Sequence, residues 1–161
     1  MKSADCGRAK KTTIMKKTGE MTSEPGRWPW HVALYWKSNA SMWEYVCGGS
    51  LISKNAVITA AHCVATPLTE KPVKFENMTV QFGKYWRKYN HSEDYVQTRE
   101  IAHVIIHPNY SGTTFDSDLA LLILKSPVDL TSSVSPVCYP TVANTLLEEY
   151  QLQSGNIGTV S

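Results

Sequence analysis

His62 and Asp118 are the residues of this chain whose types and spacing best fit a chemical role. His62 stands in residues 59–63, Thr-Ala-Ala-His-Cys, and Asp118 precedes the apolar run 119–124. An imidazole can take a proton from an attacking hydroxyl, while a carboxylate holds its tautomer and stabilises the imidazolium. The two would belong to a nucleophilic triad in the chain order His, Asp, Ser. Asp116, two positions before Asp118, is a weaker candidate and is interpreted as a loop residue.

Other residues with chemical potential fit structural roles better. His103 and His107 are four apart, but they flank an apolar run typical of a strand, which argues against a metal pair on a helix. Ser50 lacks the G-x-S-x-G elbow of a nucleophile. Glu70 and Glu76 are the only carboxylates of the loop over residues 66–78, too few to predict a calcium site. No two cysteines form a CxxC pair, so we expect no zinc or thioredoxin-type chemistry, no metal and no cofactor.

The elements that must position these residues are short strands. Apolar runs bounded by turn residues predict strands over 32–36, 49–52, 56–59, 79–82, 101–106 and 119–124. The polar segment 53–55, Ser-Lys-Asn, predicts a hairpin between the second and third strands. Only residues 141–153 invite a helical interpretation. Six strands in about a hundred residues indicate an all-β barrel or sandwich.

The charge distribution excludes one class of partner. Residues 1–20 carry six Lys or Arg and two acidic residues, whereas the rest of the chain carries ten basic and twelve acidic residues. The basic charge therefore belongs to a tail and not to a binding face. Without a clustered basic patch and interleaved aromatic residues, a nucleic-acid partner is not expected.

Cysteine usage and glycosylation motifs favour an extracellular protein. The sequence has four cysteines, for which three pairings are open on sequence alone. Four N-x-[ST] motifs make glycosylation candidates of Asn39, Asn77, Asn90 and Asn109. Together these features favour secretion. Residues 1–5 open no apolar stretch, so we expect neither a signal peptide in this sequence nor a membrane span.

Five segments, taken in their order along the chain, resemble motifs of the trypsin/chymotrypsin family of serine endopeptidases. The motifs lie in residues 26–34, 47–53, 57–63, 107–110 and 118–122, and the resemblance is densest over 28–124. It implies an all-β fold: the first six-stranded antiparallel barrel of a two-barrel fold, with the second barrel almost entirely missing. It further implies a basic, propeptide-like tail or tether over 1–19 and the N-terminal part of a peptidase domain over 20–161. Barrel one would span about 28–124, and 125–161 would start the crossover to barrel two.

The resemblance also assigns roles to individual residues. His62 would act as general base and then general acid, and Asp118 as the buried carboxylate that orients it. Cys47 and Cys63 match the disulfide that closes the histidine loop. Cys6 and Cys138 resemble the pair that tethers a propeptide to the protease domain. The segment 16–19, Lys-Lys-Thr-Gly, departs from the Ile-Val-type sequence at which such proteases are activated.

The expected function is that of a secreted trypsin-like serine endopeptidase, most like clotting or immune-cascade proteases of invertebrates. Because the sequence reaches Ser161 before any nucleophilic serine, oxyanion hole or specificity pocket, the chain as given is expected to be inactive. The alternative is a non-catalytic secreted homologue that acts as a binding or regulatory module. The full-length protein would have protein substrates or inhibitors as its partners. The missing second barrel would be the main packing partner of the first, which predicts an exposed apolar face with unpaired strand edges.

Overall fold

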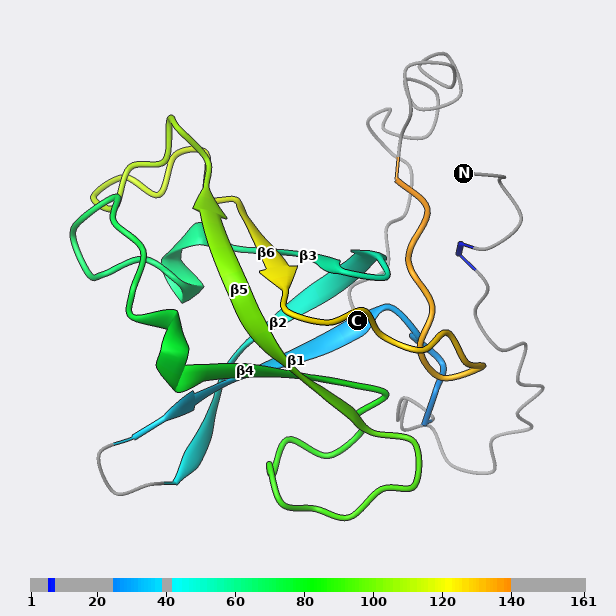
Figure 1. Cartoon of the computed structure of the whole chain (residues 1–161). Helices are drawn as coiled ribbons and strands as arrows, with labels where there is room; N and C mark the ends of the chain where they lie inside the picture. The colour runs from blue at the N-terminus through cyan, green and yellow to red at the C-terminus, as the bar shows by residue number, and fades with distance from the viewer. Residues whose placement is uncertain (1–5, 8–24, 39–41, 140–161) are drawn as a thin grey trace, which may run out of the picture.

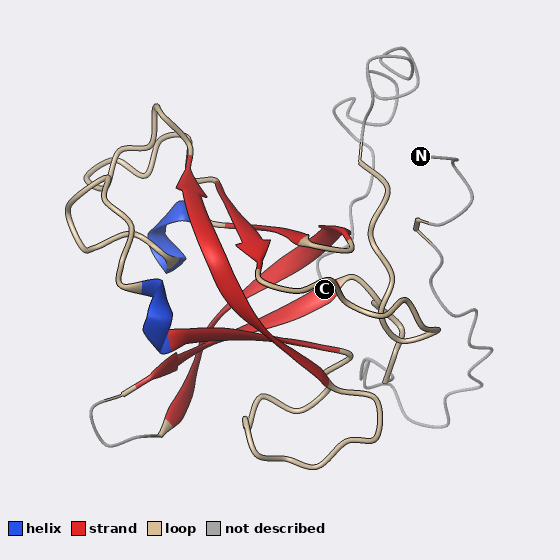
Figure 2. Ribbon diagram, in the orientation of Figure 1, coloured by secondary structure: helices blue, strands red, loops and turns tan. Residues whose placement is uncertain are grey.

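Apolar side chains that alternate along the strands fill the interior of a closed barrel. The computed structural model describes residues 6–7, 25–38 and 42–139. Its strands are β1 (His31–Lys37), β2 (Trp43–Ser53), β3 (Ala56–Thr59), β4 (Met78–Phe82), β5 (Gln97–Ile106) and β6 (Ala120–Leu124). Two single-turn 3-10 helices, η1 (Ala61–Cys63) and η2 (Phe75–Asn77), complete the regular structure of the described residues. Figures 1 and 2 show the strands arranged as one barrel.

The six strands are all antiparallel and follow the order β1-β2-β3-β6-β5-β4 around the barrel. The barrel closes because β4 pairs with β1, with Leu34 opposite Val80. The all-β, six-stranded antiparallel barrel expected from the sequence is therefore confirmed. The expectation of unpaired strand edges is wrong, because ring closure gives each of these strands a neighbour on both sides.

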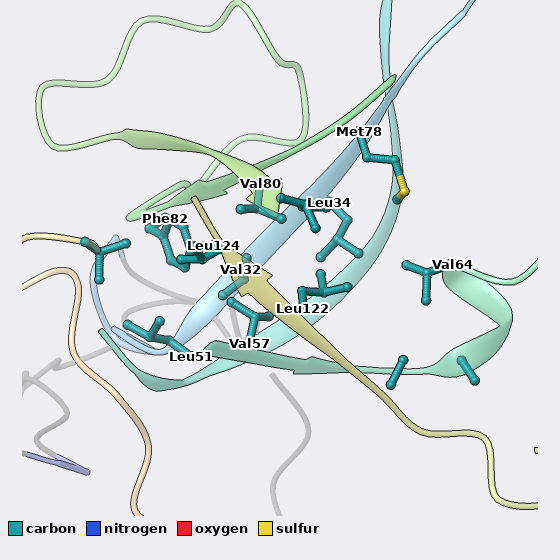
Figure 3. Packing of buried hydrophobic residues seen from close by; sticks show 14 of the residues in the cluster. Val32, Leu34, Leu51, Val57, Val64, Met78, Val80, Phe82, Leu122 and Leu124 are labelled. Carbon is teal, nitrogen blue, oxygen red and sulfur yellow. The ribbon is translucent and has the colours of Figure 1, made fainter. Parts of the chain in front are cut away.

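The barrel interior is a continuous apolar core. In β6, the side chains of Ala120, Leu122 and Leu124 are buried, whereas the residues between them are partly exposed, as the pleat of a strand requires. The side chains of Val32, Leu34, Leu51, Val57, Val80 and Phe82 fill the remaining interior (Figure 3). The loops at each end of the barrel connect strands that share this core.

The positions of all six strands were predicted, but two strands are longer than their apolar runs. β2 begins at Trp43 and not at residue 49, and β5 begins at Gln97 and not at residue 101. In these extensions exposed and partly buried residues alternate, because their outer faces meet solvent while the backbone still pairs with a neighbouring strand. The predicted hairpin is present as the turn at Lys54 and Asn55. The proposed helix over 141–153 lies outside the described residues.

The segment after β6 packs back onto the barrel. Val128 and Val134 are buried, and the backbone N–H of Val128 donates to the carbonyl of Lys54. The N–H of Val137 donates to the carbonyl of Leu51, on β2. Residues 125–139 therefore cover the end of the barrel near the β2–β3 turn before the described chain ends (Figure 1).

A loop between β4 and β5, residues 83–96, is built around one buried ammonium group. The side chain of Lys84 is 2% exposed, and its Nζ lies 3.1 Å from Oε1 of Glu93. The same Nζ donates hydrogen bonds to the carbonyls of Tyr89, at 3.3 Å, and His91, at 2.9 Å. Glu93 in turn accepts the backbone N–H of Tyr85 at 2.8 Å. The ion pair thus connects both halves of the loop.

Candidate active site

The strand register places His62 and Asp118 at the same end of the barrel. β3 and β6 are antiparallel neighbours, and Thr59 at the end of β3 lies opposite Ala120 at the start of β6. The chain leaving β3 enters η1, which contains His62, while the chain entering β6 has just passed Asp118. Two residues that are 56 positions apart therefore meet as a direct consequence of one strand pairing.

Asp118 binds His62 through both of its carboxylate oxygens. Oδ2 lies 2.6 Å from Nδ1 of the imidazole, and Oδ1 accepts the backbone N–H of His62 at 2.8 Å. This arrangement fixes the ring orientation and favours the tautomer with its proton on Nδ1. The side chain of His62 is 49% exposed and that of Asp118 is 25% exposed. Nδ1 is therefore engaged on the protein side, while the opposite nitrogen, Nε2, is left as the proton acceptor.

The electrostatics of Asp118 favour its charged form. Burial by itself raises the pKa of the carboxyl. The hydrogen bonds from the imidazole and backbone N–H of His62, and that from the backbone of Ala61, more than offset burial, so the pKa lies below its ordinary value. Asp118 is consequently ionised at neutral pH, as a carboxylate that stabilises an imidazolium must be.

The loop before Asp118 has a strained backbone. Phe115 and Ser117 adopt positive φ angles of 59° and 52°, a region that residues other than glycine rarely occupy. The ring of Phe115 meets the imidazole of His62 edge-on, with the ring centroids 6.1 Å apart. The N–H of Phe115 donates to the carbonyl of Ser111, which closes the loop. Sequence reasoning missed Phe115, because no local pattern shows that this loop turns back onto the histidine.

A disulfide holds η1 against β2 beside the histidine. Cys47 and Cys63 are bonded to each other, as the resemblance implied. The Sγ of Cys63 lies 3.5 Å from Nε2 of His62. Thr59 adds a second connection, because its Oγ1 donates to the carbonyl of Gly48 at 2.8 Å. His62 is thus fixed from two sides, by Asp118 and by the strand that carries Cys47.

The other candidates of the sequence lie elsewhere. Asp116 is exposed and accepts a hydrogen bond from the hydroxyl of Thr114, so it is a loop residue in this structure. Ser50 lies in β2 and pairs with Ile58 of β3. His103 is an exposed residue of β5, and Nδ1 of His107 accepts the N–H of Asn109.

Glu70 and Glu76 are exposed. Among the described residues, the group that could hold a metal by proximity consists of Cys47, His62 and Cys63, and neither glutamate belongs to it. Since the two cysteines are joined in a disulfide, they offer no thiolate to a metal in this structure.

The second disulfide and the described glycosylation candidates lie outside the barrel core. Cys6 is bonded to Cys138, the pairing that the resemblance implied. Asn77, Asn90 and Asn109 are exposed, whereas Asn39 lies outside the described residues. In the part of the chain that the structure describes, we find no helix with the length and apolar character needed to span a membrane.

Comparison with known proteins identifies the family. The family model described as Trypsin matches residues 17–159, and the chain therefore belongs to the trypsin family. It is 36% identical over 141 residues to clotting factor C of Tachypleus tridentatus, an alignment that covers 87% of this chain and 14% of that protein. It is 35% identical over 136 residues to modular serine protease of Drosophila melanogaster, covering 83% of this chain and 22% of that protein.

A third relative is named as an inactive serine protease. The chain is 30% identical over 141 residues to inactive serine protease PAMR1 of Homo sapiens, covering 83% of this chain and 19% of that protein. The chain spans about one seventh to less than a quarter of the length of these three relatives. The resemblance to the family is confirmed, and the roles of individual residues remain predictions.

Proposed function

We propose that this chain supplies the histidine and aspartate of a Ser-His-Asp catalytic centre in a secreted trypsin-like endopeptidase. The observation that carries the proposal is the two-point contact between Asp118 and His62, at 2.6 and 2.8 Å. A single ion pair could form by chance on a surface. A carboxylate that binds both the ring and the backbone of the same histidine determines which nitrogen faces outward.

In the proposed reaction, His62 takes the proton of a serine hydroxyl through Nε2 as that oxygen attacks a peptide carbonyl. It then returns the proton to the leaving amine, while Asp118 stays ionised and stabilises the imidazolium. The serine would lie on a second barrel of the longer protein, because residues 1–161 contain no Gly-Asp-Ser-Gly-Gly sequence. The small share of each relative that the chain spans supports this placement.

The domain limits follow from the same proposal. Residues 1–19 form the tether, 20–161 belong to the peptidase domain, and residues after Leu124 lead towards the second barrel. The bond between Cys6 and Cys138 would keep the tether attached after a cleavage between them. Two disulfides and three exposed N-x-[ST] asparagines support secretion, with the sugars on Asn77, Asn90 and Asn109.

The test is to determine the transcript beyond the codon for Ser161, express the protein that it encodes, and measure hydrolysis of a panel of peptide anilides. We expect His62→Ala to lower kcat about 10⁶-fold, by analogy with triad knockouts. Asp118→Asn should lower it about 10⁴-fold, because the amide favours the wrong tautomer. The matched control is Asp116→Asn, which removes a carboxylate from the same loop without touching His62 and should retain activity.

A non-catalytic module is the second candidate, and the similarity to a relative named as inactive favours it. It predicts that the continuing transcript encodes a second barrel with the serine replaced. It also predicts that the expressed protein hydrolyses none of the anilides. Equal activity of the wild-type and His62→Ala proteins would overturn the catalytic proposal directly.

A further inference from the structure

Three potential metal ligands converge beside the candidate active site. One Sγ from Cys47, one Sγ from Cys63 and one ring nitrogen of His62 all lie within 4.8 Å of one another. Thiolate and imidazole are the ligands that Zn²⁺ prefers, and two cysteines with one histidine leave a fourth position open to water. The disulfide is what prevents these atoms from acting as a ligand set.

We propose that reduction of the Cys47–Cys63 disulfide converts this corner of the barrel into a Zn²⁺ site whose ligands are Cys47, Cys63 and Nε2 of His62. The ring of His62 already has the orientation that such a site requires. Its Nδ1 is bound to Asp118 at 2.6 Å, while Nε2 lies 3.5 Å from the Sγ of Cys63. A carboxylate on the far nitrogen of a metal-bound imidazole fixes its tautomer and raises its basicity, as in many zinc sites.

The ligands stay close together without the disulfide, because other contacts hold their elements. Cys47 lies within β2, in register with Leu34 of β1. The N–H of Cys63 in η1 donates to the carbonyl of Ala60, the residue just before η1. The hydroxyl of Thr59 ties the end of β3 to Gly48, the residue after Cys47. Two separated thiols would therefore remain on adjacent, paired elements.

The site is accessible to a reductant and to a metal ion. His62 is 49% exposed, and the two cysteines are only partly buried. A dithiol reductant gives two electrons to the S–S bond and becomes a cyclic disulfide, and its two protons pass to the sulfurs of Cys47 and Cys63. Metal binding then releases both thiol protons to solvent.

Coordination would occupy the nitrogen that accepts the proton of the nucleophile. Reduction in the presence of Zn²⁺ would therefore switch off His62 as a base, and removal of the metal with reoxidation would restore it. This regulatory consequence rests on the function proposed above. The metal binding itself does not, because it needs only the described residues of this chain.

The test uses Co²⁺ as a spectroscopic probe and Zn²⁺ as its competitor. The protein carries Cys6→Ser and Cys138→Ser, so that one disulfide remains. It is reduced with a dithiol, freed of reductant by anaerobic gel filtration, and titrated. We expect one equivalent of Co²⁺ to give thiolate charge-transfer absorption that Zn²⁺ removes, and the oxidised protein to give none.

Three variants separate this site from metal binding by thiols alone. His62→Ala should weaken Co²⁺ binding more than Asp118→Asn does, and Asp118→Asn should weaken it about 10–100-fold, the usual cost of losing such a carboxylate. His103→Ala removes an exposed histidine from β5 and should change nothing. Equal affinity of His62→Ala and the parent protein would overturn the proposal, as would absence of thiolate absorption in the reduced protein.

Circular dichroism covers the case in which reduction unfolds the chain. If the reduced protein unfolds without metal and regains its β spectrum with one equivalent of Zn²⁺, metal binding is coupled to folding and the proposal holds. If the reduced protein stays unfolded with the metal present, the proposal fails.

Discussion

Replacing Lys84 by methionine should be one of the most costly single changes in the barrel. The side chain of Lys84 is buried, and its ammonium binds Glu93 and two loop carbonyls. Methionine keeps most of the side-chain volume but removes the charge and every hydrogen bond. Glu93 then remains, only 15% exposed, as a carboxylate without its cation. Breaking a buried pair from one side costs about 3–5 kcal/mol, because the other charge is left uncompensated.

That loss is large relative to the stability of a domain, which is usually about 5–15 kcal/mol. With a urea m-value of about 1–3 kcal/mol per molar, a loss of this size lowers the unfolding midpoint by about 2 M. The assay is urea unfolding followed by tryptophan fluorescence. The double variant Lys84→Met/Glu93→Gln should recover part of the loss, because it removes the orphaned charge as well.

The matched control is Lys125→Met. Lys125 and Glu100 form the shorter contact, at 2.6 Å, but their side chains are 59% and 71% exposed. An exposed pair competes with water and is screened by salt, so its loss should hardly move the midpoint. If Lys84→Met and Lys125→Met shift the midpoint equally, the argument that burial and not distance decides the effect is refuted.

Three further changes test other parts of the barrel. Burial lowers the pKa of His31 below 6.5. As the pH falls, the unfolded chain therefore binds a proton at His31 before the folded chain does, and stability is lost as the pH falls through 6.5. The difference in unfolding free energy between the wild type and His31→Gln should change with pH, and a constant difference would contradict this. Gly49→Ala should cost about 1–3 kcal/mol by overpacking, because a Cβ there would lie 2.9 Å from the carbonyl oxygen of Ile58; an unchanged melting temperature would contradict it. Among the described residues, Oε1 of Gln81 is a buried oxygen with no hydrogen-bond partner, so Gln81→Met should raise stability by about 1 kcal/mol, and a lower urea midpoint would contradict it.

The strands could be predicted because their apolar runs are local signals. Residues 56–59 needed no correction, since Ala56–Thr59 is β3 itself. The extension of β2 back to Trp43 could not be predicted, because those residues are held by backbone pairing with β1 and not by an apolar pattern. Strand pairing depends on partners that are distant in sequence. The same limit explains why the expectation of unpaired strand edges was wrong.

The site shows the same division between local and distant information. The segments around His62 and Asp118 resemble those of a known family, so the pair could be anticipated from sequence. Their contact depends on the register of β3 and β6, which only the structure shows. Lys84 is one lysine in a basic, aromatic loop, and its burial accompanies contacts with Glu93 and with the carbonyls of Tyr89 and His91, which only the folded loop brings to it.

The most direct test of the central claim is the tautomer of His62. It can be measured on the chain itself by long-range ¹H–¹⁵N NMR of the imidazole at neutral pH. We expect the proton on Nδ1 in the wild type and in the Asp116→Asn control, and loss of this preference in Asp118→Asn. A wild-type ring with its proton on Nε2 would have no free acceptor for a nucleophile, and would contradict the role of His62 as a general base.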